Sequence, residues 1–228
     1  MHFVILGMIV VIIVFAPQWW ARHTFKKYSQ QNDSFPGTGG QLARHLLDKQ
    51  GLHDIPVEIS TRGDHYDPSE KVVRLLEGHY KGKSLTAISI AAHEVGHAIQ
   101  DQNNSPLLRS RTKLVQFASI TEKIGSAAMI AMPFVTAISR SPALGLILFI
   151  SAIASLFVST IVHLVTLPVE WDASFHKALP MLKKGAYITK NEEQAVKKIL
   201  KAAAFTYVAA SLASLLNLAR WIAILRRR

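Results

Sequence analysis

Two histidines of this sequence, His93 and His97, are four residues apart, and Glu94 directly follows the first. On a helix this spacing puts both imidazole rings on one face, one turn apart, so both can bind a single metal ion. The glutamate lies on the flank of that face, where it can take a proton from a metal-bound water molecule. Residues of these types at this spacing are typical of zinc hydrolases.

The residues around the motif predict the helix that such chemistry requires. Ser84 is a suitable N-cap, and apolar residues recur at helical spacing from Leu85 to Ile99. Gly96 lies between the histidines, although glycine costs a helix about 1 kcal/mol relative to alanine. With small neighbours on the same helix, it indicates close packing against another backbone segment, so we expect a metal site here rather than a chance match.

The composition points to a membrane protein. Half of the 228 residues are hydrophobic, which is high for a soluble globular protein. Cysteine is absent, so any metal must be held by His, Asp or Glu. The formal net charge is +11, but many basic residues flank apolar runs, as the positive-inside rule predicts. We therefore expect no nucleic-acid partner.

Three apolar regions are candidate membrane segments. Residues 1–22 contain an apolar run and the pair Trp19-Trp20, followed by basic residues, and predict an anchor whose C-terminal end is cytoplasmic. Residues 124–167 contain two apolar runs joined by a short turn and predict a transmembrane helical hairpin. Residues 202–228 predict a C-terminal apolar helix that spans the bilayer, re-enters it or lies in its interface.

The remaining segments predict a small α+β domain. Residues 23–123 contain a helix ending before Gly51, two strands at 57–60 and 71–76, and the histidine helix. The two strands are expected to form a hairpin or to be neighbours, and the second is either a core strand or an edge for an extended substrate. Residues 168–201 are expected to complete this domain, with a capping box from Thr189 to Glu192 opening a long helix.

A catalytic zinc site normally has a third protein ligand. Metzincins place a histidine where this sequence has Asn103, which excludes that arrangement. The apolar run from Leu85 to Ala92 is too short for the histidine helix to span a membrane, which excludes an intramembrane protease. The thermolysin-like solution remains, with a glutamate from a separate helix. Glu170 is the best candidate, and Asp172 is its main competitor.

Three stretches together carry a family resemblance: Asp64 to Pro68, Ser84 to Gln100, and Leu167 to Ser174. The chain resembles the YugP-like family of bacterial membrane zinc metallopeptidases over nearly its whole length. It is more distantly similar to the heat-shock-associated and CaaX-processing membrane zinc proteases. The resemblance implies a mainly α membrane protein with an N-terminal anchor, a gluzincin-like zinc domain, a transmembrane hairpin and a C-terminal long helix. It also implies a multi-pass location in the bacterial cytoplasmic membrane, with the site facing the cytoplasm.

The resemblance further implies that His93, His97 and Glu170 bind zinc and that Glu94 is the general base. The distant relatives often carry an aspartate four residues after the ligand glutamate, which orients a histidine. This sequence has Ser174 there, so Asp172 or another acceptor must take that role. Phe175-His176 also differs from the basic residues that are more usual in the closer family.

These features predict a zinc-dependent endopeptidase that hydrolyses peptides or membrane proteins near the bilayer. A second donor to the developing oxyanion is expected, and His65, Tyr66 and His176 are the candidates. The alternative is a membrane scaffold or binding protein with a structural zinc site. That alternative requires a fourth protein ligand, such as His65 or Asp67. The oligomeric state is left open.

Overall fold

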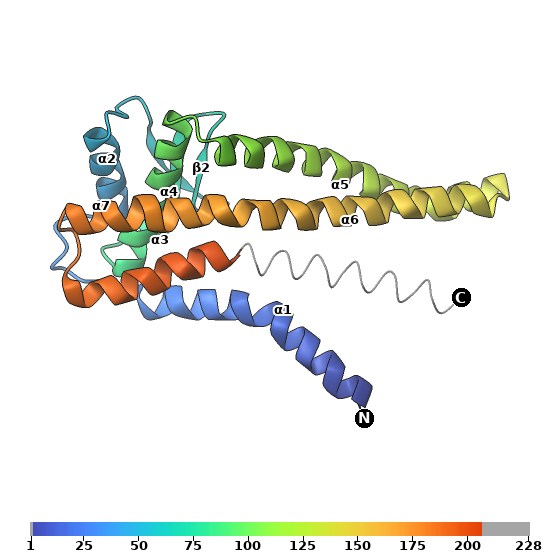
Figure 1. The fold of residues 1–228 in the computed structure, drawn as a ribbon, viewed down its shortest axis with the longest axis horizontal. Helices are drawn as coiled ribbons and strands as arrows, with labels where there is room; N and C mark the ends of the chain where they lie inside the picture. Colours follow the sequence, from blue (N-terminus) through green and yellow to red (C-terminus); the bar gives the residue numbers. More distant parts are fainter. Residues whose placement is uncertain (1, 207–228) are drawn as a thin grey trace. The chain divides into compact units, whose positions relative to one another are not determined.

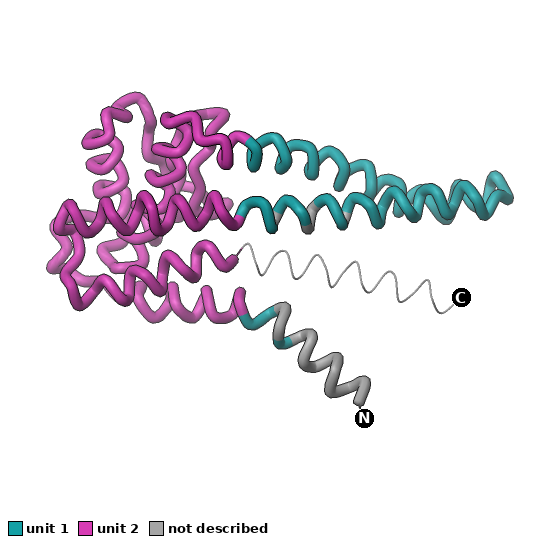
Figure 2. The backbone as a smooth tube through the Cα atoms, in the orientation of Figure 1, with its two compact units in different colours: residues 1–16, 110–166, 207–228 teal, residues 17–109, 167–206 magenta. Residues whose placement is uncertain are grey.

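The computed structural model describes the backbone of residues 2–206. It describes the side chains of these residues except 2–11, 13, 14, 156, 159, 160 and 163. Most of the predicted C-terminal apolar helix, from residue 207 onward, therefore lies outside the described residues. The chain divides into two compact units (Figure 2). Residues 1–16, 110–166 and 207–228 make the first unit, and residues 17–109 and 167–206 make the second.

The described core of the first unit is an antiparallel pair of helices, α5 (Pro106–Ser139) and α6 (Pro142–Trp171). The chain turns between them at Arg140, which has a φ of 51°. The helices pack closely at two glycines. A Cβ atom at Gly125 would lie 2.1 Å from the Ser155 hydroxyl, and one at Gly145 would lie 2.4 Å from the Thr136 hydroxyl.

The prediction of a transmembrane hairpin is wrong. Across the part of the chain that the structure describes, no helix combines the length and the apolar character that a membrane crossing requires. A hairpin needs two spans of about 20 mainly apolar residues. In α5, the uncharged stretch extends only from 124 to 139, because Lys113, Glu122 and Lys123 precede it. This stretch is too short to cross a membrane. The expected multi-pass topology loses its support with the hairpin.

The second unit contains a three-stranded sheet in the order β1-β3-β2. The strands β1 (Val57–Ser60) and β3 (Val72–Leu76) are the two predicted ones, and they are parallel neighbours. The third strand, β2 (His65–Asp67), was not predicted; it lies between the other two in the sequence and pairs antiparallel with β3. Since β3 is paired on both sides, it is a central strand and offers no free edge to a substrate.

The helix α4 (Leu85–Gln102) runs through the middle of this unit, between α2 (Gly39–Lys49) and the segment that follows α6 (Figure 1). Its N-cap is Ser84, whose hydroxyl accepts a hydrogen bond from the backbone of Ala87. Every residue from 86 to 100 is buried. The short α3 (Glu77–Tyr80) lies between β3 and α4. The predicted motif helix therefore exists and forms the central element of this unit.

Three further segments pack around α4. The first helix, α1 (His2–Lys27), contacts the start of α4 through a hydrogen bond from the Thr86 hydroxyl to the Phe25 carbonyl, 2.9 Å long. The chain leaves α6 through the π-helix η1 (Asp172–Ala178) and then α7 (Leu179–Lys184). Residues 190–206 are helical and begin at the predicted capping box, where the Thr189 backbone donates to Glu192 Oε2. The packing of η1 on α4 holds the end of α6 close to α4.

Candidate metal centre

The structure brings together three of the predicted metal ligands. His93 and His97 lie one turn apart on α4, and Glu170 lies in the last turn of α6. Glu170 Oε2 is 3.1 Å from His93 Nε2 and 3.3 Å from His97 Nε2. Two ligand atoms on one tetrahedral zinc ion are about 3.3 Å apart, because each zinc–ligand distance is about 2.0–2.1 Å. Both nitrogen–oxygen distances are therefore those of a zinc site.

The outer nitrogen of each histidine contacts a group that defines the position of its proton. His97 Nδ1 is 2.8 Å from Gln100 Oε1, an atom that can only accept. His93 Nδ1 is 3.1 Å from Ser174 Oγ, and the Ser174 hydroxyl donates its own proton to the Leu200 carbonyl. In the neutral form that binds a metal ion, each ring would therefore carry its hydrogen on Nδ1 and present Nε2 toward Glu170.

This arrangement favours positive charge between the three side chains. Without it, two nitrogen lone pairs and a carboxylate oxygen would repel each other with little screening by water, because none of these side chains is more than 5% exposed. Burial raises the pKa of Glu170, but positive charge and hydrogen-bond donors on His97 and His93 outweigh it and hold the pKa well below its ordinary value; a zinc ion would supply the positive charge in their place. Glu170 is therefore ionised. Neutral imidazole nitrogens and a carboxylate are ligands that zinc takes, so the residues present fit a zinc ion.

Glu94 and Asp172 lie beside this cluster in different ways. Glu94 directly follows His93 on α4 and is 6% exposed, so it is buried on the helix that carries both histidines. Asp172, the competitor for the ligand role, is turned elsewhere. Its Oδ2 accepts from Gln100 Nε2 at 2.8 Å, and its Oδ1 is 3.2 Å from His176 Nδ1. Asp172 therefore reaches the histidines only through Gln100.

The three candidate oxyanion donors lie in different environments. Tyr66 faces the core from β2, and its hydroxyl donates to Asp101 Oδ2 at 2.8 Å. Burial and the Asp101 carboxylate raise the pKa of Tyr66. His65 lies on the opposite face of β2, and its Nδ1 contacts the Gly63 carbonyl. The His176 side chain is 66% exposed on η1. The structure thus separates His65 from the face that packs on α4.

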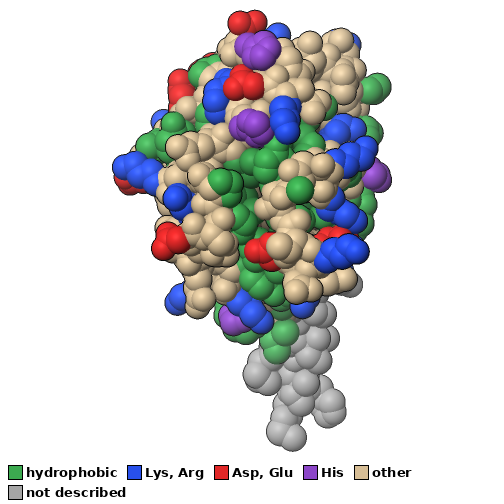
Figure 3. All heavy atoms as spheres, turned by 90° about the vertical axis from the view of Figure 1, so that its left-hand side faces the viewer, with side chains coloured by type: hydrophobic (Ala, Val, Ile, Leu, Met, Phe, Trp, Pro, Cys, Tyr) green, Lys and Arg blue, Asp and Glu red, His purple; other side chains and the backbone are tan. Residues whose placement is uncertain are grey.

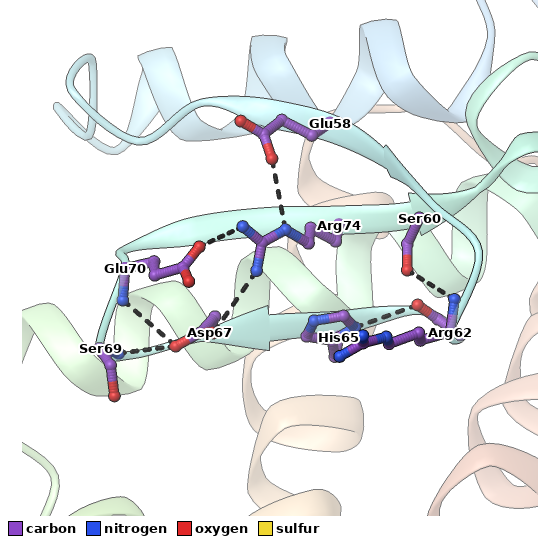
Figure 4. Close-up of polar contacts among 9 residues, drawn as sticks. Glu58, Ser60, Arg62, His65, Asp67, Ser69, Glu70 and Arg74 are labelled. Atoms are coloured by element: carbon purple, nitrogen blue, oxygen red, sulfur yellow. Dashed lines mark hydrogen bonds and ion pairs between the residues drawn. The ribbon is translucent and has the colours of Figure 1, made fainter.

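The outer face of the sheet holds an ion-pair cluster centred on Arg74 (Figure 4). The Arg74 guanidinium contacts Glu58, Asp67 and Glu70 from three neighbouring segments. Asp67 also accepts hydrogen bonds from the backbones of Ser69 and Glu70. These contacts occupy Asp67 in fixing the turn between β2 and β3.

The close approach of α4 to η1 depends on Gly96. A Cβ atom at this position would lie 2.8 Å from the Ala173 carbonyl oxygen and 3.3 Å from Lys177 Cβ. The missing side chain therefore lets the histidine helix lie against the backbone that follows Glu170. A π-helix such as η1 is rare and often occurs at functional sites.

Sequence reasoning missed two residues of the site, Gln100 and Ser174. Gln100 is three residues after His97, on the same side of the helix, which is a usable signal. Ser174 is four residues after Glu170, where the distant relatives often have an aspartate. It orients His93 with a hydroxyl in place of a carboxylate.

The fold and the site define a protein in which two histidines from one helix and a glutamate from another could hold a zinc ion. The chain belongs to the family described as "Putative neutral zinc metallopeptidase", which matches residues 3–226. It is also 38% identical over 226 residues to the "Putative membrane protease YugP" of Bacillus subtilis (strain 168), covering 98% of this chain and 96% of that protein. No solved structure matches the chain. The predicted family and the predicted zinc cofactor are both confirmed.

Proposed function

We propose that this chain is a zinc-dependent endopeptidase with a His-His-Glu ligand set and a glutamate general base. One observation carries the proposal: two histidine nitrogens and a glutamate oxygen, the ligand types of a catalytic zinc site, lie within 3.3 Å of one another in His93–Glu170 and His97–Glu170 pairs. Glu94, on the same helix as the histidines, is buried. The membership in a zinc metallopeptidase family supports the same reaction class.

The number of ligands favours a catalytic site over a structural one. Catalytic zinc has three protein ligands and one open position, whereas structural zinc has four protein ligands. Among the side chains that the structure describes, the cluster contains His93, His97 and Glu170. His65 and Asp67, the proposed fourth ligands of a structural site, are engaged elsewhere. Among the described residues, no observation favours the scaffold alternative.

Each protein group would have a defined task in hydrolysis. Zinc, when bound, lowers the pKa of a water molecule toward ~7 and polarises a carbonyl group. Glu94 would accept a proton from the attacking water and transfer it to the leaving amine. Ser174 and Gln100 would keep the two imidazole rings in the orientation for metal binding. The burial of these groups strengthens their electrostatic interactions.

A cavity at the end of α6 offers room for a substrate side chain. Its volume is about 440 Å³, and its lining is mostly apolar, formed by Leu107, Leu167, Pro168, Trp171, Asp172 and His176. Two of these residues directly follow the ligand glutamate in the sequence. We propose that the cavity accepts an apolar side chain of a peptide or membrane-protein substrate.

A location at a lipid bilayer is supported by two observations. The relative from Bacillus subtilis is named a membrane protease. In the first unit, large apolar side chains are exposed, among them Ile130 at 70%, Phe134 at 65% and Ile138 at 85%. Exposed apolar surface of this kind marks an interaction site. A nucleic-acid partner is not proposed, because Lys and Arg are dispersed among acidic and apolar side chains on the face in Figure 3.

The substitution Glu94→Gln tests the proposal. It removes the proton acceptor while keeping the size of the side chain, so we expect peptide cleavage to fall about 10²–10⁴-fold. Bound zinc, measured by elemental analysis, should remain. Glu77→Gln, on the exposed surface of α3, is the matched control and should cleave at the wild-type rate. Unchanged cleavage by the Glu94 variant would refute the assignment of the base.

A further inference from the structure

We propose that Gln100 is a positioning residue of the zinc centre, which fixes the tautomer of His97 and holds the segment around Glu170 against α4. Gln100 is three residues after His97 on α4 and is 1% exposed. The inference concerns zinc binding and does not depend on peptide hydrolysis. The experiments on Gln100 therefore test it independently of the role proposed for Glu94.

The contacts of the Gln100 amide permit only one orientation. Its Nε2 lies 2.9 Å from the Val169 carbonyl and 2.8 Å from Asp172 Oδ2, and both of these atoms are acceptors. The amide –NH₂ group must therefore face them with its two protons. Oε1 then faces His97 Nδ1 at 2.8 Å. A flipped amide would put oxygen against two acceptors and lose both bonds.

This orientation determines where the His97 proton lies. Because Gln100 Oε1 can only accept, His97 must donate from Nδ1, which leaves the Nε2 lone pair for a metal ion. With the other tautomer, the Nε2 proton would point at Glu170 Oε2, 3.3 Å away. That hydrogen bond would occupy both ligand atoms and compete with zinc.

The same amide also ties the glutamate ligand to the histidine helix. Val169 precedes Glu170, and Asp172 lies two residues after it, so the two bonds from Nε2 hold the chain on both sides of the ligand. Val169 is fully buried, so no solvent replaces the bond to its carbonyl if that bond is lost. One side chain thereby sets the position of a histidine and of the carboxylate that meets it.

A zinc-affinity measurement on the full-length chain tests the inference. We expect Gln100→Met, which keeps the length and removes the amide, to raise the zinc dissociation constant about 10–100-fold in a chelator competition. Gln102→Met is the matched control, because it makes the same change at an exposed position of α4. It should leave zinc affinity unchanged. A wild-type zinc affinity in the Gln100 variant would overturn the proposal.

An exchange of donor and acceptor separates positioning from general destabilisation. Gln100→Glu puts a carboxylate against Asp172 and should weaken zinc binding. Adding Asp172→Asn restores a donor–acceptor pair, with the amide now on residue 172, and should recover at least tenfold of the lost affinity. Simple additivity of the two substitutions on zinc affinity would contradict the proposal, because two contacting residues that act together on the zinc centre are expected to couple.

The tautomer itself can be read without zinc. In the zinc-free protein at pH 8, nitrogen-15 NMR of the histidine rings should show His97 protonated on Nδ1. Gln100→Met should remove this preference at His97 and leave His93 unchanged, since Ser174 holds His93 independently. The same tautomer of His97 in both proteins would refute the role of Gln100.

Discussion

The closest approach between α4 and the segment after Glu170 is at Gly96, and Gly96→Ala perturbs it with a single carbon atom. The new Cβ would lie 2.8 Å from the Ala173 carbonyl oxygen, where ordinary contact begins at 3.4 Å. This contact is with backbone, so it cannot be relieved by a side-chain rotation. We expect α4 and η1 to move apart by about 0.6 Å.

The displacement acts on both stability and zinc affinity. Alanine is favoured over glycine in a helix by about 1 kcal/mol, whereas overpacking costs about 1–3 kcal/mol. The free energy of unfolding should therefore fall by at most about 2 kcal/mol. Zinc–ligand distances tolerate only about 0.2 Å, so the dissociation constant should rise tenfold or more. The loss of zinc affinity should thus exceed what the change in stability alone explains.

The measurement is a chelator competition combined with denaturant unfolding of the zinc-free protein. Gly78→Ala is the control, because a Cβ atom at Gly78 on α3 has nothing within 4 Å. The control should be as stable as the wild type, or more stable by up to about 1 kcal/mol, and should bind zinc equally well. A Gly96→Ala protein that is more stable and retains full zinc affinity would refute the close-packing argument.

Two further predictions concern the metal and the sheet. Removal of zinc with EDTA should lower the melting temperature measured by differential scanning fluorimetry, because a ligand at 1,000 times its dissociation constant stabilises a protein by about 4 kcal/mol. An unchanged melting temperature would contradict a native zinc site. Tyr66→Phe removes the hydrogen bond to Asp101 and should lower the free energy of unfolding, measured by urea denaturation, by about 1 kcal/mol. An unchanged free energy of unfolding would show that this bond does not stabilise the protein.

The sequence by itself determined the local features of the site. The four-residue spacing of His93 and His97 requires a shared face once the segment is helical, and Ser84 and the apolar spacing specify that helix. The alternation in 57–60 and 71–76 likewise predicted β1 and β3. These features follow from helix and strand periodicity, which depends only on neighbouring residues. The family resemblance supplied the ligand set.

The tertiary structure decided everything that joins distant residues. Glu170, rather than Asp172, meets the histidines because the end of α6 is held against α4 at Gly96 and Gln100. The order of the strands and the lack of a free edge on β3 came from pairing across the sheet. The expected transmembrane hairpin failed because, among the described residues, no helix is long and apolar enough to cross a membrane; in α5, Glu122 and Lys123 shorten the uncharged stretch. Contacts between residues more than 70 positions apart depend on packing, which no local periodicity specifies.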